Sequence, residues 1–214
     1  MQIYVIRHGE TNSNLTGKFQ GWLDDVLNEN GIGLAELTGK GMTGIKFDAA
    51  FSSPLKRAYD TTRIVLRESG NGDLPIATDR RLMELNLGDL EGKIIRGPEC
   101  EVDPGMIRIY FSTPGVLGRF PGGESIDDLK KRTQEFIKEL AQKDYGRVLV
   151  GTHGCAVRAM MNFLYDNPAD FWHGRVPYNC AVTIVEGDGR GLKLVGDDVL
   201  YYDRSLIVDR YPMK

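Results

Sequence analysis

Cysteines and long apolar runs, which mark disulfide-rich and membrane proteins, are scarce in these 214 residues. There are three cysteines, Cys100, Cys155 and Cys180, an odd number without a Cys-x-x-Cys spacing, so we expect free thiols and no disulfide framework. The longest apolar runs have the length of a strand, which argues against a membrane-spanning helix. The first run begins directly after Met1 and leaves no room for a signal peptide, so we expect a cytoplasmic protein.

An excess of positive charge is also lacking. The formal net charge is −3, the pI is about 5.7, and no Lys/Arg run or basic tail is present, which argues against nucleic acid as a partner. Charged residues make up 27% and hydrophobic residues 41%, the balance of a globular protein with one sizeable core. We therefore predict a single domain over residues 1–214 with neither a nucleic-acid nor a membrane partner.

There are only three histidines, and two of them occupy equivalent places. Residues 2–6 form an apolar run that leads into Arg7-His8-Gly9, and residues 148–152 lead into His153-Gly154. A run of β-forming residues followed by His-Gly is typical of a buried strand that ends at the carboxyl edge of a sheet, where open α/β sheets bind ligands. Two imidazoles beside an arginine form a cationic, nucleophilic pocket, so the pattern predicts a phosphate site.

Strand and helix patterns alternate along the chain, which predicts an α/β sandwich. Further strands are expected at residues 49–51 and 75–78, and as a C-terminal hairpin of residues 181–186 and 192–200 with its turn around 187–191. Helices are expected at residues 31–37, 54–68, 106–111, 124–142 and 155–165. Pro54 is the expected first residue of the second helix, with Ser53 as its cap.

Three further segments are predicted to form a lid, a loop and a helix with a solvated face. Residues 90–123 contain many Gly and Pro residues and little periodicity, so we predict a lid or an insertion there. Residues 12–21 are rich in Gly and Asn and are expected to form a loop. The helix at 124–142 has a clear apolar face, and its basic residues, including Arg132, are interpreted as solvated surface.

Other polar residues add to the predicted site. Arg7 supplies a forked donor that matches phosphate oxygens, and Arg57 falls in the first turn of an expected helix, where anions are attracted. Glu84 is embedded among apolar neighbours, which raises the pKa of a carboxyl and suits it to proton donation. An ion pair of Glu84 with Arg80 or Arg81 is the alternative interpretation.

The loop at residues 12–21 offers further polar groups. Asn14, Gln20 and Gly21 are candidates for contacts with phosphate or with the rest of a substrate, and loop capping is the alternative for each of them.

Together these segments resemble a known family. Arg7-His8-Gly9-Glu10-Thr11, followed by Asn14 and Gln20-Gly21-Trp22, resembles the signature of the histidine phosphatase superfamily, in its phosphoglycerate mutase-like branch. Residues 52–58, 82–92, 121–125 and 152–154 are similar to the family's later motifs and occur in the expected order along nearly the whole chain. Residues 26–31 depart from the family's pattern, so helix initiation there is expected to differ.

The resemblance implies a fold and a role for each matching residue. The fold is a three-layer α/β/α sandwich on a mostly parallel sheet with one antiparallel strand. His8 would become the phosphohistidine; Arg7, Arg57 and His153 would hold the phosphoryl group; and Glu84 would donate the proton. Glu10 receives no catalytic role, and no metal or other cofactor is implied. The residues expected to bind substrate are Asn14, Gln20, Gly21 and Gly154.

The function expected from this resemblance is hydrolysis of a small phosphate monoester, such as a sugar phosphate or a phosphoglycerate-type metabolite. A cofactor-dependent phosphoglycerate mutase is the first alternative, although dedicated mutases of this type are usually longer. A non-catalytic phosphate-binding protein is less favoured, because such relatives usually lose the nucleophile or a residue that holds phosphate. A metal hydrolase is disfavoured because His8 and His153 lack the carboxylate cluster and short spacing of a metal site.

Overall fold

One six-stranded sheet organises the fold, in the order β3-β2-β4-β1-β5-β6. Its strands are β1 (Gln2–Arg7), β2 (Ala49–Ser52), β3 (Ile76–Thr78), β4 (Arg147–Thr152), β5 (Val182–Gly187) and β6 (Leu192–Val199). Strand β5 pairs antiparallel with both of its neighbours, and the other pairs are parallel, so one strand runs against the rest. The computed structural model describes residues 1–187 and 191–208, and residues 188–190 of the predicted hairpin turn lie outside the described residues.

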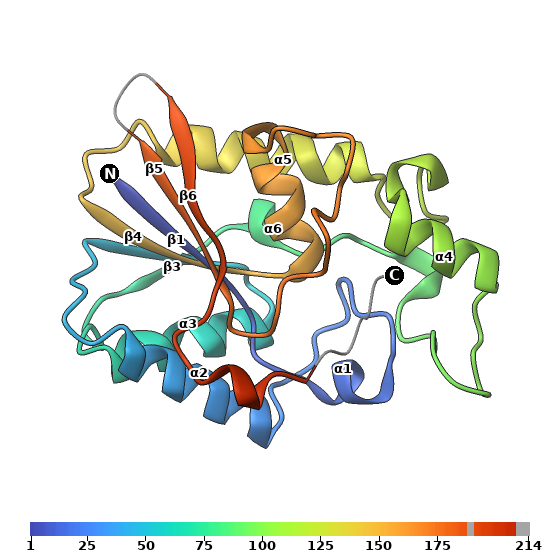
Figure 1. Ribbon diagram of the computed structural model, residues 1–214, viewed down its shortest axis with the longest axis horizontal. Helices are drawn as coiled ribbons and strands as arrows, with labels where there is room; N and C mark the ends of the chain where they lie inside the picture. Colours follow the sequence, from blue (N-terminus) through green and yellow to red (C-terminus); the bar gives the residue numbers. More distant parts are fainter. Residues whose placement is uncertain (188–190, 209–214) are drawn as a thin grey trace.

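Helices cover both faces of this sheet (Figure 1). Helices α2 (Glu29–Gly41) and α3 (Lys56–Glu68) lie on one face, and α5 (Ile126–Leu140) and α6 (Gly154–Met161) lie on the other. Alternate residues of β1 enter two separate cores, because successive side chains of a strand point to opposite faces. Tyr4 and Ile6 pack with α2 and α3, whereas Ile3 and Val5 pack with α5 and α6. The predicted three-layer α/β/α sandwich is confirmed.

Helix boundaries differ from the prediction in several places; α2, for example, continues to Gly41 instead of ending at Leu37. Helix α3 begins at Lys56 after Leu55, which provides no side-chain cap, so the prediction of Pro54 as first residue and Ser53 as cap was wrong. The Ser53 hydroxyl instead lies 2.8 Å from Nε2 of His153. Helix α6 ends at Met161 and continues as a 3-10 turn, so it is shorter than expected.

A short helix, α1 (Asn12–Thr16), occupies part of the segment expected to be a loop. Thr11 and Asn14 form a capping box at its start, in which the Thr11 hydroxyl accepts from the Asn14 N–H and the Asn14 side chain accepts from the Thr11 N–H. Asn14 therefore caps this helix, as the alternative interpretation of that residue proposed.

Helix α4 (Pro104–Ser112) lies beyond the end of the sheet, apart from the four helices of the two outer layers (Figure 1). It belongs to a third apolar cluster, in which Tyr110 packs with Phe120, Ile126 and Trp172. No helix among the described residues is both long and apolar enough to cross a membrane. The three cysteines are free, and Cys155 and Cys180 are buried.

Candidate active site

The sheet places the two histidines side by side. Strands β1 and β4 are parallel neighbours with Arg7 opposite Thr152, so His8 and His153 leave the sheet at the same edge. Their ring centroids are 5.2 Å apart at an interplanar angle of 60°. His8 is 3% exposed and His153 is fully buried. The predicted convergence of the two strand ends is therefore present in the structure.

The surroundings of His8 determine which ring nitrogen carries the proton. Its Nδ1 lies 2.7 Å from the carbonyl oxygen of Gly9, which can only accept, so Nδ1 carries the hydrogen. Burial lowers the pKa of His8 well below 6.5, and the nearby charges of Arg57 and Arg7 lower it further. His8 is thus a neutral imidazole whose Nε2 holds the lone pair. Nucleophilic attack by a histidine requires this form.

His153 is bound differently. Its Nε2 lies 2.8 Å from the Ser53 hydroxyl, which can donate or accept, and its buried Nδ1 has no hydrogen-bond partner among the described residues. Burial lowers the pKa of His153 well below 6.5, with Arg57 as the next cause. If Ser53 donates to Nε2, the proton of the neutral ring sits on Nδ1.

Two arginines add charge to the site. Arg57 is fully buried, and its guanidinium donates to the carbonyls of Leu23 and Gly21, each at 2.7 Å, while its Nε has no partner among the described residues. Burial lowers the pKa of Arg57 to about 10, so it remains charged at neutral pH. Arg7 donates to the Pro177 carbonyl. Both guanidinium groups are close enough to lower the pKa of His8 and of Glu84.

Glu84 is held at the start of helix α6. Its Oε1 accepts from the backbone N–H groups of Leu85 and Ala156, and its Oε2 accepts from Cys155, at 2.8 to 3.0 Å. Burial raises the pKa of the Glu84 carboxyl, opposed by these N–H groups and by Arg57. Arg81 pairs instead with Asp79 and Glu139. Arg80 lies over the Trp22 ring, so the alternative of an ion pair of Glu84 with Arg80 or Arg81 is not found among the described residues. Of the two carboxyl oxygens, Oε2 accepts one hydrogen bond and Oε1 accepts two, which leaves Oε2 more room for a proton.

A small cavity of about 50 Å³ opens over three of these five residues, whereas Arg57 and His153 are buried and do not line it. Arg7, His8 and Glu84 line it, together with the polar residues Asn14, Lys18 and Gln20. Its remaining wall is mostly apolar and includes Leu87, Ile95, Tyr110, Phe111, Trp172 and Val176. A ligand with a charged group next to Arg7 and His8 and an apolar part next to the wall would fit this distribution.

The residues expected to bind substrate are placed unequally. Asn14, Gln20 and Gly154 line the cavity, and Gln20 also donates to Asp25 at 3.1 Å. A Cβ atom at Gly154 would lie 3.0 Å from Val176, so this position favours glycine. Gly21 does not line the cavity. Its N–H is donated to Glu91, and its carbonyl accepts from Arg57.

Glu10, to which the sequence assigned no catalytic role, accepts hydrogen bonds from the side chains of Asn28 and Asn30. Asn28 also caps helix α2 by accepting from the Gly31 N–H. A Cβ atom on Gly31 would lie 2.1 Å from the Glu10 carbonyl oxygen, so only glycine fits there. The segment that departs from the family's pattern thus begins helix α2 with its own asparagine cap.

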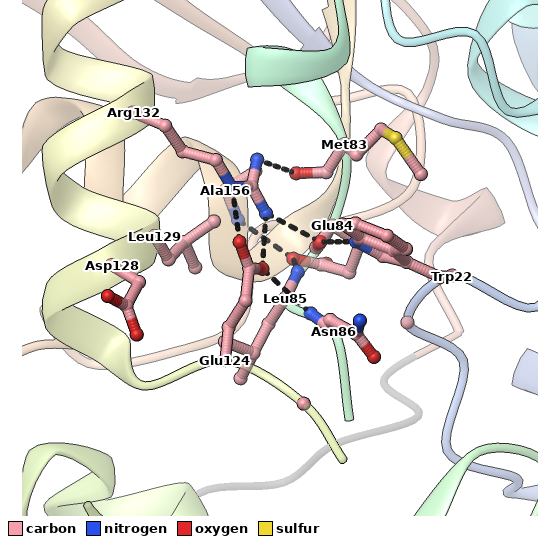
Figure 2. Close-up of polar contacts among 12 residues, drawn as sticks. Trp22, Met83, Glu84, Leu85, Asn86, Glu124, Asp128, Leu129, Arg132 and Ala156 are labelled. Atoms are coloured by element: carbon pink, nitrogen blue, oxygen red, sulfur yellow. Dashed lines mark hydrogen bonds and ion pairs between the residues drawn. The ribbon is translucent and has the colours of Figure 1, made fainter. Parts of the chain in front are cut away.

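Three residues that the sequence interpretation missed support the site from behind. Glu91 accepts four backbone N–H groups, those of Gly21, Trp22, Leu23 and Leu87, at 2.8 to 3.1 Å. It thereby fixes the loop whose carbonyls hold Arg57. Arg132 and Glu124 bind the segment that carries Glu84 (Figure 2). The interpretation of Arg132 as solvated surface was wrong, because its side chain is 16% exposed and turned inward.

Comparison with known proteins agrees with this geometry. Residues 3–197 match the model of the histidine phosphatase superfamily (branch 1), so the chain belongs to this family. A 2,3-bisphosphoglycerate-dependent phosphoglycerate mutase of Methylobacterium radiotolerans is 35% identical over 167 residues, which are 76% of this chain and 78% of that protein. A metal-independent phosphoserine phosphatase of Arabidopsis thaliana is 34% identical over 164 residues, 74% of this chain and 66% of that protein.

The solved structure of YhfR from Bacillus stearothermophilus has a similar fold. The two structures superpose with a TM-score of 0.83 at 31% sequence identity. The superposition covers 94% of this chain and 98% of YhfR. The prediction of a phosphoglycerate mutase-like enzyme that acts on phosphate esters is confirmed at the level of the family.

Proposed function

We propose that this protein is a phosphatase that hydrolyses a small phosphate monoester through a phosphohistidine on His8. The observation that carries the proposal is the hydrogen bond from Nδ1 of His8 to the Gly9 carbonyl. It leaves the Nε2 lone pair of a neutral imidazole beside two buried arginines. Phosphoryl transfer depends mainly on positioning and on neutralising the negative charge of the phosphoryl oxygens, and this set of groups can do both.

In the first half of the reaction, the phosphoryl oxygens face Arg7, Arg57 and the N–H of His153. Nε2 of His8 attacks phosphorus in line, the N–P bond forms, and the bond from phosphorus to the ester oxygen breaks. Glu84 starts protonated, which its raised pKa supports, and gives its proton from Oε2 to the departing oxygen. The alcohol leaves, and the phosphoryl group stays on His8.

In the second half, the ionised Glu84 removes a proton from water. The hydroxide oxygen attacks phosphorus, the N–P bond breaks, and its electron pair returns to Nε2 of His8. Phosphate is released, and both residues regain their starting protonation states. The chemistry needs only groups of this chain and water.

A mutase is the alternative, supported by relatives that are named phosphoglycerate mutases. A mutase transfers the phosphoryl group back to a substrate that carries other anionic groups, and these need cations along the wall of the site. Among the described residues that line the cavity, the only lysine or arginine besides Arg7 is Lys18. The scarcity of cations along this cavity therefore supports hydrolysis over transfer.

The test measures phosphate release and covalent labelling together. The wild-type protein should release phosphate from 4-nitrophenyl phosphate, and a rapid quench should trap an acid-labile, base-stable phosphohistidine. The His8→Ala variant should lose both signals. Hydrolysis that persists in His8→Ala would overturn the covalent role. Conversion of 3-phosphoglycerate to 2-phosphoglycerate faster than phosphate release would favour the mutase.

A further inference from the structure

The acid Glu84 lies on a stretch of backbone without regular structure. Residues 84–87 join two 3-10 turns and belong to neither a helix nor a strand. Backbone groups in such a segment have no ladder of their own, so other groups must satisfy them. A proton donor also has to be held in place closely, because an error of about 1 Å at a reacting group can reduce the rate on the order of 100-fold.

Residues 79–87 form the acid segment, and one guanidinium group binds three of its carbonyls. Figure 2 shows the bonds to the carbonyls of Met83 and Glu84. Nη1 of Arg132 donates to the carbonyls of Arg81 and Met83, at 2.9 and 2.6 Å. Nη2 of Arg132 donates to the carbonyl of Glu84 at 2.7 Å. The last two carbonyls belong to the peptide groups on either side of the Glu84 Cα. Arg132 therefore fixes both peptide planes that set the direction of the Glu84 side chain.

Glu124 holds Arg132 in this orientation. Its Oε1 accepts from Nε of Arg132 at 2.9 Å, and its Oε2 accepts from Nη2 at 2.8 Å, a two-point pairing that matches the planar guanidinium. The same Oε2 accepts from the Asn86 N–H at 3.0 Å, and the Glu124 N–H is donated to the Asn86 carbonyl at 2.9 Å. The acid segment is thus bound on both sides of Glu84.

The indole of Trp22 completes the arrangement. It donates to the Glu84 carbonyl at 2.9 Å, so this carbonyl receives two donors (Figure 2). On the opposite side, the Glu84 carboxylate is fixed by the N–H groups at the start of α6. Arg132 lies on α5, which packs against α6, so two adjacent helices determine the position of Glu84 from its two ends.

We propose that Arg132, oriented by Glu124, is a positioning residue for proton transfer by Glu84. The inference rests on the proposed function, because it assigns a part in the same reaction. Arg132 touches neither the reacting atoms nor the cavity, and it acts through the backbone of the acid. Its removal should therefore impair the departure of alcohols that need a proton more than the departure of those that do not.

The test compares two aryl-containing esters of similar size with wild type and Arg132→Lys. Benzyl phosphate has a poor leaving group that needs the proton, whereas 4-nitrophenyl phosphate has a good one. The value of kcat/KM reports the steps up to formation of phosphohistidine, so the later hydrolysis does not obscure the difference. Lysine keeps the charge but lacks the fork. We expect a loss on the order of 100-fold for benzyl phosphate and less than about threefold for 4-nitrophenyl phosphate.

Arg81→Lys is the matched control. Arg81 also bridges the acid segment and α5, through Asp79 and Glu139, but its side chain does not bind the carbonyls around Glu84. It should leave both kcat/KM values within about threefold of wild type. Glu84→Gln sets the upper limit of the selective loss, because it removes the proton donor itself. Glu124→Gln should show the same selectivity with a smaller loss, and it serves if Arg132→Lys does not fold.

The outcomes separate the two proposals. Equal losses on both esters, or no loss on either, in Arg132→Lys or in Glu124→Gln would overturn the positioning role while leaving the phosphatase intact. A wild-type protein that releases phosphate from neither ester and labels no histidine would overturn the proposed function, and the inference with it.

Discussion

The strand ends at His8 and His153 are built from the same sequence pattern but lead into different structures. Strand β1 ends in a loop that leads to the short helix α1, whereas His153 is itself the N-cap of helix α6. The ring of His8 is bound by a backbone carbonyl, and the ring of His153 by a serine hydroxyl. A carbonyl can only accept, so it fixes the tautomer of His8. A hydroxyl can do either, so His153 can adjust to its ligand.

This comparison shows that the immediate partner of a ring nitrogen, and not the local sequence, determines which nitrogen each histidine leaves unbound. Both rings are buried beside the same arginines, and burial lowers the pKa of both. They therefore share a charge state but differ in the nitrogen that is left for chemistry. His8 presents a lone pair that suits attack, and His153 can present an N–H that suits binding of a phosphoryl oxygen.

The largest expected effect separates these roles by covalent labelling. In His153→Ala, phosphohistidine should still form on His8 from 4-nitrophenyl phosphate, about 100- to 1000-fold more slowly, because one donor to the phosphoryl group is lost. Rapid-quench labelling measures the rate, and peptide mapping locates the label. His8→Ala, which should show no label, is the control. Loss of labelling in His153→Ala to the level of His8→Ala would mean that the two histidines are not distinct in function.

A second prediction concerns pH, and it tests the charge state that the two histidines share. The unfolded chain binds a proton at each histidine below pH 6.5, whereas folded His8 and His153 resist it, so their contribution to stability falls as the pH drops below 6.5. Glu84 acts in the opposite sense. Its raised pKa means that its contribution is present below 4.5 and is lost as the pH rises through the folded-state pKa.

Comparing wild type with His8→Asn isolates the histidine, because Glu84 is present in both proteins. As the pH falls from 6.5 to 5, the free energy of unfolding of the variant should increase relative to that of wild type, by at most about 1.4 kcal/mol per pH unit. Urea unfolding at pH 5, 6, 7 and 8 provides the measurement. A difference that does not change with pH would show that the pKa of His8 is not lowered in the folded protein.

The sequence predicted the parts of this site that follow from strand periodicity. Apolar runs that end in His-Gly locate both histidines, and parallel pairing of β1 with β4 brings them together. Arg7, His8 and Glu84 line one cavity, with His153 and Arg57 buried beside them, as the family's motifs implied.

The supporting residues could not be predicted in the same way. Arg132 and Glu91 act on backbone carbonyls and N–H groups, which every residue carries, so no residue pattern marks their partners. Arg132 also lies among basic residues on the polar side of a helix, which is usually solvated. Its neighbour Glu124 and its reach to the acid segment become visible only in three dimensions. Ser53 was similarly mistaken for a helix cap.

The smallest expected effect concerns Ser53, which distinguishes the two strand ends most directly. Ser53→Ala removes the hydroxyl bound to His153 and leaves the hydrogen bond of His8 to Gly9 untouched. A neutral hydrogen bond contributes about 1 kcal/mol, so the affinity for orthovanadate, a phosphate-like probe, should fall by about 3- to 10-fold. Inhibition of 4-nitrophenyl phosphate hydrolysis measures this affinity.

Ser52→Ala is the control for this last change. Ser52 is equally buried at the end of β2, but its hydroxyl donates to the Ser53 carbonyl and accepts from Thr62 instead of contacting His153. Both variants should lose similar amounts of stability, and only Ser53→Ala should bind orthovanadate more weakly. If the two affinities fall alike, the hydroxyl at Ser53 supports the fold of the strand end and does not orient His153 toward a ligand.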